Sequence, residues 1–413
     1  MNNFWICIEP SVFIWKDDKR VLFYNSNNYE KLLQERHDSI KTIVDNLIDP
    51  ANFYSALFSD ADMMNAEFNE FLNNIVKIKM GAILPFEGND NKPVTIPPYY
   101  IFPRDFNLLK KREIDYFDPH MLRNLKDITI QITGKCSLSC PSCSYFYRQK
   151  CHCSRSENEL SMDAIKTIVR KIKLTGIQKV DIIGGDIFRH GDFCDVMNVL
   201  DDITQTKIYH SNFKFINKET AKLLLRNGAN ALLKILVEPL DIWLDELHLL
   251  FDELHSFEHE LIWAFSLTSE ATLKNFETLV DKYKISNYEY HVLYNGKNMD
   301  FLLERRFLSE EDIWQLKLGL KDIFANQMLN KNFFSKLFIH ADGQIYEDQN
   351  TISIGTIHDN LENILYSLMN NEGAWFRTRL RNNVCRNCVY RFLCPPPSDL
   401  ENLLQRNTIC NKY

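Results

Sequence analysis

The feature that most constrains the fold is an alternation of strand-like and helix-like segments between residues 126 and 330. Short apolar runs alternate there with stretches of helical spacing, and Ser161 and Asn217 stand where they would cap two helices. The expected strands are 127–133, 179–185, 207–212, 231–239, 260–268 and 288–295. The expected helices are 161–174, 193–203, 217–227, 241–257, 270–283 and 309–324. This alternation predicts a parallel sheet with right-handed crossovers, either open or curled into a partial barrel.

Several polar or small residues fall just where these expected strands end. They are Cys136 after the first strand, Gly184 to Asp186 after the second, and Ser211 and Asn212 at the end of the third. Ligands of parallel α/β folds bind at the carboxyl ends of the strands. We therefore expect a functional site at this edge of the sheet.

The regions on either side have a different organisation. Residues 1–90 begin with strand-like runs at 4–10, 12–16 and 20–26, followed by helical stretches at 29–48 and 65–79, which indicates a small α+β domain. A stretch rich in Pro, Asn and Asp follows, so 91–125 is expected to be a linker. The remaining domains are expected at 126–330 and 331–413, the latter with a hairpin turning at Asp342 and Gly343, a helix at 359–371 and a cysteine-rich tail.

Composition and charge exclude two kinds of partner. The chain has 413 residues, of which 45% are hydrophobic and 25% charged, as in globular proteins of two or three domains. A net charge of −7 provides no basic field for a nucleic-acid backbone. No apolar run approaches the roughly 18 residues of a membrane span, and the first residues, "MNNFWICIEP", do not form a signal peptide. We expect a cytoplasmic protein without a nucleic-acid or membrane partner, whose thiols stay reduced.

The eleven cysteines are unevenly distributed along the chain. Cys7 and Cys194 stand alone, and the other nine form two groups, at 136–153 and 385–410. An odd total in tight groups indicates metal ligation more than a disulfide framework. Cys151 and Cys153 leave three interpretations open, namely ligation, a transient disulfide, or a loop without a role.

Cys136, Cys140 and Cys143 have the spacing C-x3-C-x2-C directly after a strand. A structural zinc site would lack a ligand with three thiolates, so a partial zinc site is the alternative interpretation. Iron–sulfur clusters are commonly held by cysteine thiolates. Three thiolates leave one iron of a [4Fe–4S] cluster with an open coordination position, which a substrate or cosubstrate could take.

This segment resembles the signature of the radical S-adenosylmethionine (SAM) superfamily. The resemblance implies a [4Fe–4S] cluster on these three cysteines, with SAM on the open iron and cleaved to a 5′-deoxyadenosyl radical. Gly184, Gly185 and Asp186, in "DIIGGDIF", resemble the glycine-glycine-acid motif that lines SAM, with aspartate where glutamate is usual.

By the same resemblance, Ser211, Asn212 and Glu238 are candidate SAM contacts. This chain departs from the family at Leu236, where a serine is common, and at Ser142, where an aromatic residue usually packs toward adenine. Tyr145 and Phe146 follow shortly after and are candidates to replace that aromatic residue.

The tail carries Cys385, Cys388, Cys394 and Cys410, enough thiolates for a closed site holding a second [4Fe–4S] cluster or structural zinc. It resembles the SPASM extension of radical SAM enzymes in a shortened, twitch-like form. The ligands of one auxiliary cluster are present. Those of the other are missing, with Ser398 at one ligand position, and Glu347 and Asp348 in the hairpin where a cysteine is usual.

Residues 1–90 resemble the recognition element of enzymes that mature ribosomally made peptides, a winged-helix-like module that binds a leader peptide by strand addition. The strand 20–26 and the helix 65–79 would form its groove, and Glu67 and Glu70 would suit a basic leader. A winged-helix docking domain without this role is the alternative. The whole chain resembles radical SAM peptide (RiPP) maturases, including a group with double-glycine leaders in Bacteroidales that contains pseudo-enzymes.

The predicted fold is therefore a partial (β/α)6 radical SAM barrel between an N-terminal recognition domain and a shortened SPASM extension. The predicted function is a radical SAM oxidoreductase that crosslinks, forms a thioether in, or epimerises a precursor peptide. A flavodoxin- or ferredoxin-type protein would be its electron donor. One alternative is a degenerate pseudo-enzyme that presents the peptide to a partner maturase. Another is a radical SAM enzyme acting on a protein or small molecule, as a sulfatase maturase does.

Overall fold

The structure is a computed structural model that describes residues 2–88, 91–98, 121–149, 155–226, 230–370 and 373–411. Cys151, Cys153 and residues 99–120 of the expected linker lie outside the described residues. The chain divides into two compact units. The first contains the described residues of 1–116, 309–331 and 376–397, and the second contains those of 117–308, 332–375 and 398–413.

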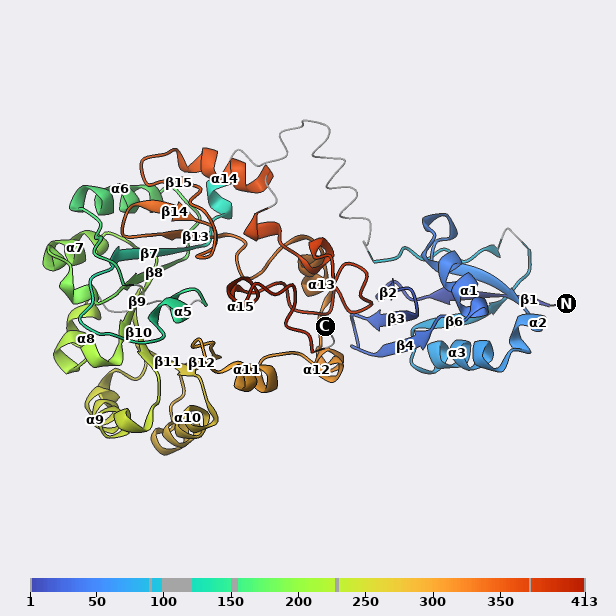
Figure 1. The fold of residues 1–413 in the computed structure, drawn as a ribbon. Helices are drawn as coiled ribbons and strands as arrows, with labels where there is room; N and C mark the ends of the chain where they lie inside the picture. Colours follow the sequence, from blue (N-terminus) through green and yellow to red (C-terminus); the bar gives the residue numbers. More distant parts are fainter. Residues whose placement is uncertain are drawn as a thin grey trace. The chain divides into compact units, whose positions relative to one another are not determined.

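The second unit is built on a nine-stranded sheet with the order β12-β11-β10-β9-β8-β7-β13-β14-β15 (Figure 1). Strands β7 to β12 are all parallel and adjacent in chain order, which confirms the predicted parallel sheet. Their bounds are β7 (Asp127–Thr133), β8 (Lys179–Gly184), β9 (Thr206–Asn212), β10 (Ala231–Val237), β11 (Leu261–Leu267) and β12 (Tyr288–Val292). The predicted hairpin continues the sheet beyond β7 as β13 (Lys336–Ile339) and β14 (Gln344–Tyr346), followed by β15 (Gly355–Thr356).

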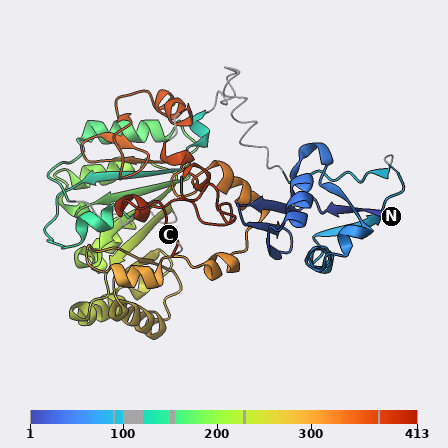
Figure 2. The same ribbon diagram turned by 45° about the vertical axis from the view of Figure 1, so that its right-hand side comes forward.

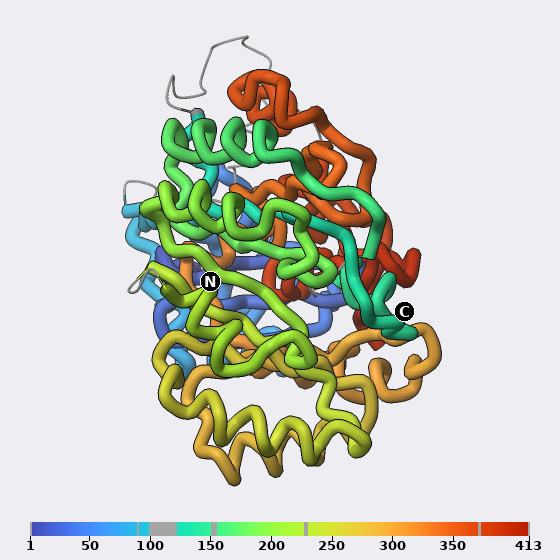
Figure 3. The backbone as a smooth tube through the Cα atoms, turned by 90° about the vertical axis from the view of Figure 1, so that its left-hand side faces the viewer, coloured from blue at the N-terminus to red at the C-terminus, as the bar shows by residue number. Residues whose placement is uncertain are grey.

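Helices follow the parallel strands and lie in a row along one face of the sheet (Figure 3, green to yellow). They are α6 (Met162–Ile172), α7 (Phe193–Leu200), α8 (Lys218–Leu224), α9 (Leu244–Leu254) and α10 (Glu270–Tyr283). Ser161 and Asn217 cap α6 and α8 as predicted, because their side chains accept hydrogen bonds from backbone N–H groups of the first turn. The remaining helices of this unit are α5 (Cys143–Tyr147), α11 (Met299–Arg305), α14 (Leu361–Asn370) and α15 (Asp399–Leu403).

Burial separates the two faces of the parallel sheet by side-chain type. Trp263 and Phe265 on β11 pack against Phe251 of α9 and Phe276 of α10, so this face forms the apolar core. The opposite face carries ionisable side chains. His210 Nε2 on β9 lies 2.7 Å from Asp181 Oδ1 on β8, and the ammonium of Lys234 lies 2.8 Å from the Glu289 carboxylate.

Lys234 reaches Glu289 across β11, where the small side chain of Ala264 stands opposite Glu289 in the ladder. Burial by itself would raise the pKa of Glu289, but hydrogen bonds from His291 and Lys234 outweigh it and lower that pKa to about 2. A carboxyl group with a depressed pKa stabilises the fold above its unfolded-state pKa, and this contribution is lost as the pH falls through the folded value.

The first unit contains two antiparallel sheets with the orders β5-β1-β6 and β2-β3-β4. Their strands are β1 (Asn3–Ile8), β2 (Val12–Lys16), β3 (Arg20–Asn25), β4 (Lys31–Glu35), β5 (Ser55–Ser59) and β6 (Gly81–Pro85). The helices in the described residues of this N-terminal part are α1 (Asp38–Ile48), α2 (Asp60–Met63) and α3 (Ala66–Lys77). Side chains of both sheets, α1 and α3 share one hydrophobic core that includes Ile6, Phe23, Val44 and Phe71.

Two expectations for this unit were wrong. The helix predicted at 29–48 begins only at Asp38, because 31–35 pairs with β3 as strand β4, and this pairing overrides the helical preference of "KLLQE". The helix predicted at 309–324 is two helices, α12 (Glu310–Gln315) and α13 (Leu320–Met328), separated around Gly319. Both belong to this unit, and in Figure 2 these orange segments lie beside the dark blue strands.

Among the described residues, no helix is long and apolar enough to cross a membrane.

We predict that Glu289→Gln destabilises the protein in a pH-dependent way. At pH 6 the variant should have a lower free energy of unfolding than the unmodified protein. The difference should shrink as the pH falls below 4.5, the ordinary pKa of glutamate. Urea unfolding between pH 3 and 7 measures it, with exposed Glu277→Gln on α10 as the control. A difference in the free energy of unfolding that does not change with pH would contradict the lowered pKa of Glu289.

Candidate cofactor site

The three cysteines predicted to bind a cluster lie in one loop and the helix that follows it. Cys136 and Cys140 lie between β7 and α5, and Cys143 is the first residue of α5, with its N–H donating to the Cys140 carbonyl over 3.2 Å. Burial raises the pKa of the Cys136 and Cys140 thiols, and the charges of the neighbouring cysteines raise it further. The structure therefore brings the three thiols within electrostatic range of one another. Within the described ranges, no three Cys, His, Asp or Glu side chains form a group that could hold a metal ion.

The Gly184–Gly185–Asp186 loop after β8 is bonded to the backbone of the cysteine loop. The N–H of Gly185 donates to the Thr133 carbonyl over 3.0 Å, and the N–H of Asp186 donates to the Lys135 carbonyl over 2.8 Å. A Cβ atom on Gly185 would lie 2.7 Å from two carbonyl oxygens of that loop and 2.8 Å from the Cβ of Cys136. Glycine is needed here because the two backbones approach too closely for any side chain.

Two of the predicted SAM contacts also hold local backbone structure. The Asp186 carboxylate accepts a hydrogen bond from the Phe188 N–H over 3.1 Å, and burial raises the pKa of this carboxyl. Asn212 accepts from the Lys214 N–H over 3.0 Å in the same manner. Ser211 is buried at the end of β9. These three residues lie at strand ends as predicted, and caps occupy part of the bonding capacity of Asp186 and Asn212.

Glu238, predicted from β10, lies close enough to the cysteine loop for its charge to act on Cys140. Burial raises the pKa of Glu238, and its Oε1 accepts a hydrogen bond from the Thr268 hydroxyl over 3.0 Å. Sequence reasoning missed Thr268, although a polar residue just after the strand 261–267 is the same signal that pointed to Ser211 and Asn212.

Helix α5, which begins with Cys143, is held from two sides. On one side, Gln149 donates to the Tyr294 carbonyl over 2.8 Å and accepts from the Tyr294 N–H over 2.9 Å. On the other, the guanidinium of Arg148 donates to the side chain of Asn350 over 2.7 Å, and Asn350 returns a bond to the Arg148 carbonyl over 3.1 Å. The cysteine helix is thus fixed between the segment after β12 and the segment after β14.

Glu347 and Asp348, at the position where the resemblance led us to look for a cysteine, accept hydrogen bonds from other parts of this unit. Both are buried. A Glu347 oxygen accepts from the Ala374 N–H over 2.8 Å, and an Asp348 oxygen accepts from the side-chain amide of Asn402 over 2.9 Å. Ser398 begins α15 in a capping box with Glu401.

The four C-terminal cysteines are divided between the two units. Cys385, Cys388 and Cys394 belong to the first, where the Cys388 N–H donates to the Cys385 carbonyl over 2.9 Å. Cys410 belongs to the second and forms an isolated parallel bridge with Leu308. The ligand set predicted for an auxiliary cluster stays a prediction.

A cavity of about 410 Å³ opens beside Cys140 and Cys143 and is also lined by Tyr147, Arg148 and Arg155. The number and type of these thiols, rather than their positions, match the donor set of a [4Fe–4S] cluster that has one open iron.

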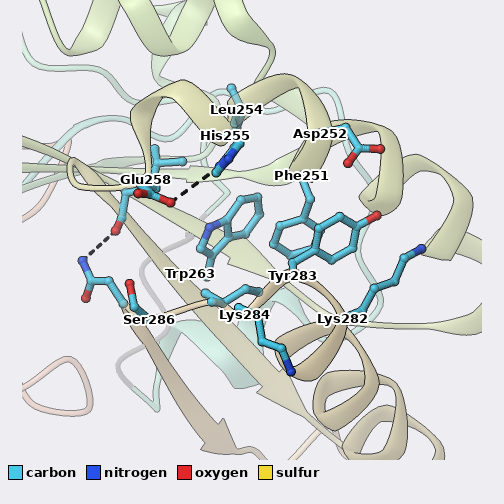
Figure 4. Close-up of a pocket in the computed structure, with 13 residues that line it drawn as sticks. Phe251, Asp252, Leu254, His255, Glu258, Trp263, Lys282, Tyr283, Lys284 and Ser286 are labelled. Atoms are coloured by element: carbon cyan, nitrogen blue, oxygen red, sulfur yellow. Dashed lines mark hydrogen bonds and ion pairs between the residues drawn. The ribbon is translucent and has the colours of Figure 1, made fainter.

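A second pocket, of about 280 Å³, is shown in Figure 4. It is lined by Phe251, Trp263 and Tyr283, and the rings of Phe251 and Tyr283 stack with centroids 4.7 Å apart. Its residues surround the amino ends of β11 and β12, whereas the predicted site lies at the carboxyl ends. It is therefore separate from the cysteine site.

No family model matches this chain. Part of it is similar to proteins named probable GTP 3′,8-cyclase. The one from Methanosarcina mazei is 28% identical over 125 residues, 30% of this chain and 34% of that protein. The one from Methanosarcina acetivorans is 27% identical over 139 residues, 34% of this chain and 38% of that protein. The matched region thus spans just over a third of each cyclase.

The crystal structure of SuiB from Streptococcus suis matches the fold over nearly all of the chain. It covers 98% of this chain and 100% of SuiB with a TM-score of 0.51 and 14% identity. SuiB has also been solved bound to S-adenosylmethionine and bound to the precursor peptide SuiA. The mixed α/β fold with its parallel sheet is thus similar to that of SuiB.

We predict that Gly185→Ala lowers the free energy of unfolding by about 1–3 kcal/mol, because the added methyl overpacks two backbones that cannot separate without breaking their hydrogen bonds. The amount of iron retained after reconstitution should also be lower in this variant. Denaturant unfolding and iron analysis measure both quantities. Gly319→Ala is the matched control, since its Cβ would meet nothing closer than 3.8 Å. Equal effects of both variants would contradict the close-approach argument.

Proposed function

We propose that this protein is a radical SAM enzyme that modifies a ribosomally made peptide. The observation that carries the proposal is the joining of two motifs in one site. The C-x3-C-x2-C loop and the Gly184–Asp186 loop meet backbone to backbone, at the sheet edge where such folds bind ligands. Neither motif alone specifies this chemistry, and their contact supports a shared site.

In this proposal Cys136, Cys140 and Cys143 hold a [4Fe–4S] cluster, and SAM contacts the residues at the neighbouring strand ends. These are Gly184, Gly185, Asp186, Ser211, Asn212 and Glu238. A cluster and SAM bound there supply an electron and a 5′-deoxyadenosyl radical, the hydrogen-abstracting agent of this chemistry.

The chain itself positions and shields these groups. The absence of a side chain on Gly185 leaves the backbone free to lie against the cysteine loop. Burial raises the pKa of Asp186 and of Glu238 at this edge of the sheet. The two-sided attachment of α5 fixes Cys143.

Support for a peptide substrate comes from the SuiB fold and from the N-terminal unit. SuiB binds a precursor peptide, and its fold extends over almost all of this chain. The predicted groove needs one correction, because both edges of β3 are already paired with β2 and β4. Among the described residues, the outer edge of β4 pairs with no other strand, and His37 beside β4 lies 3.7 Å from Glu67 of α3. We place leader binding at this edge of β4, by strand addition.

The same proposal assigns one auxiliary [4Fe–4S] cluster to Cys385, Cys388, Cys394 and Cys410, with structural zinc as the alternative. It further places the protein in the cytoplasm with a flavodoxin- or ferredoxin-type electron donor. The double-glycine-leader group in Bacteroidales is the proposed subfamily.

The test is SAM cleavage by the anaerobically reconstituted, dithionite-reduced protein. We expect 5′-deoxyadenosine from the unmodified chain and none above background from Cys136→Ala, Cys140→Ala or Cys143→Ala, since each removes a cluster ligand. Cys194→Ala is the matched control, because this exposed cysteine stands alone on α7.

Loaded protein that forms no 5′-deoxyadenosine would overturn the enzymatic proposal. The remaining interpretation would then be the presenting pseudo-enzyme, and the search would turn to a partner maturase. Metal analysis of the same samples distinguishes iron from zinc at the C-terminal cysteines.

A further inference from the structure

Strand β12 (Tyr288–Val292) is the last strand at one end of the nine-stranded sheet (Figure 1). Among the described residues it pairs only with β11, in parallel. Tyr288 is 41% exposed and Tyr290 is 54% exposed. A free edge offers N–H and C=O groups to another chain, and proteins usually protect it with lysine, proline or a covering segment. The sequence "YEYHV" of β12 contains neither lysine nor proline.

Two hydrogen bonds to β11 show which backbone groups of this strand face outward. The Trp263 N–H donates to the Asn287 carbonyl over 3.1 Å, and the Leu293 N–H donates to the Leu267 carbonyl over 2.9 Å. Successive residues of a strand direct their backbone groups to alternate sides, so the odd-numbered residues of this segment face β11. The backbone groups of Tyr290 and of the residues two positions on either side of it therefore lie on the outer edge.

The side chains of β12 divide between the two faces of the sheet. Tyr288 and Tyr290 lie on the helix face, where their rings contact Phe276 of α10 with centroids 5.5 and 5.2 Å apart. Glu289 and His291 lie on the other face, with His291 Nε2 3.4 Å from a Glu289 oxygen. One face of the edge is therefore aromatic, and the other carries a carboxylate beside an imidazole.

The free edge has a hollow beside it and a defined end. The hollow, of about 470 Å³, lies between α10 and β12, and its lining includes Phe276, Val280 and Tyr288. At the carboxyl end of the strand, Arg306 donates to the Val292 carbonyl over 2.6 Å. Pairing with another strand is therefore limited to the five residues of β12.

The sequence of β12 is complementary to itself when two copies run antiparallel. With Tyr290 opposite Tyr290 of the partner subunit, both residues direct their backbone groups outward and can exchange two N–H···O=C bonds. Glu289 then lies opposite His291 of the partner subunit, and this pair occurs twice because of the symmetry. On the other face, Val292 of the partner subunit lies opposite Tyr288, beside the hollow.

We propose that β12 is a dimerisation edge, at which a second copy of this chain pairs antiparallel about a two-fold axis at Tyr290. The occupant is a second copy because β12 itself supplies both halves of each pair, the carboxylate with the imidazole and one tyrosine with the other. A ladder of five residues buries little surface, so the dimer is weak and depends on concentration.

The dimer goes beyond the proposed function and requires neither a metal, SAM nor a peptide. Because the two copies of β12 run in opposite directions, their candidate cofactor sites lie at opposite ends of the joined edge. The pairing is therefore tested on the protein alone, whether or not it cleaves SAM.

Sedimentation velocity of the full-length chain at increasing concentration tests the pairing. The mean mass should rise toward twice that of one chain and no further, because a two-fold pairing is closed. In the same samples, hydrogen exchange at the Tyr290 and Val292 amides should slow as the concentration rises, because these N–H groups face the partner subunit. Amides of β9, in the middle of the sheet, are the internal control and should not change.

Two substitutions at the axis test the position of the interface. Tyr290→Pro removes an N–H that faces away from β11, so the single chain should stay folded. Its dimer dissociation constant should rise about tenfold or more, because two hydrogen bonds between the subunits are lost. Tyr290→Lys places two ammonium groups opposite each other, so its dimer should weaken at low salt and recover in part at high salt. Tyr366→Lys, the same change at an exposed tyrosine of α14, is the matched control.

The mass of a single chain at every concentration would overturn the proposal. A dimer that forms equally well with lysine at position 290 would overturn it too, and so would growth beyond two chains. If circular dichroism shows that Tyr290→Pro is unfolded, Tyr290→Lys and the exchange at the Tyr290 amide decide the matter.

Discussion

The close approach of two backbones at Gly185 is the contact on which the candidate site depends. Carbonyl oxygens of Gly134 and Lys135 occupy the space that a Cβ would need, and hydrogen bonds from Gly185 and Asp186 hold the loops at this separation. Because the cysteine loop contains little regular structure of its own, its shape is set by this neighbour. The positions of the thiols therefore depend on a residue that carries no functional group.

The parallel sheet explains why residues from distant parts of the sequence meet there. Each strand delivers one or two polar residues to the same edge: Cys136 from β7, Asp186 from β8, Asn212 from β9 and Glu238 from β10. Raised pKa values at Cys140 and Glu238 have a common main cause, the burial of both groups at this edge.

Much of this arrangement was predictable because it follows from local patterns. Strand β7 has the predicted bounds, and the caps at Ser161 and Asn217 follow from short-range chemistry. The placement of Gly184 to Asp186 beside the cysteines follows from strand order in a parallel sheet. The predictions that failed were decided by tertiary pairing. In β4, residues that are compatible with a helix pair with β3 instead.

Contacts between residues distant in sequence also could not be predicted from local sequence patterns. Nothing near Arg391 or Phe392 indicates that they pack on β2, and nothing near Asn350 indicates that it holds the helix of Cys143. The burial of β3 on both faces is visible in its sequence. The segment "RVLFYN" does not alternate apolar and polar residues as a strand with one solvent-exposed face does.

The central claim is that three thiolates hold a cluster whose remaining iron binds SAM. Electron paramagnetic resonance of the dithionite-reduced protein tests it most directly, in the variant with Cys385→Ser, Cys388→Ser and Cys394→Ser so that only one cluster contributes. The account predicts that adding SAM changes the shape and position of the reduced-cluster signal, because SAM becomes a ligand of one iron. A signal that is present and unchanged by saturating SAM would contradict it.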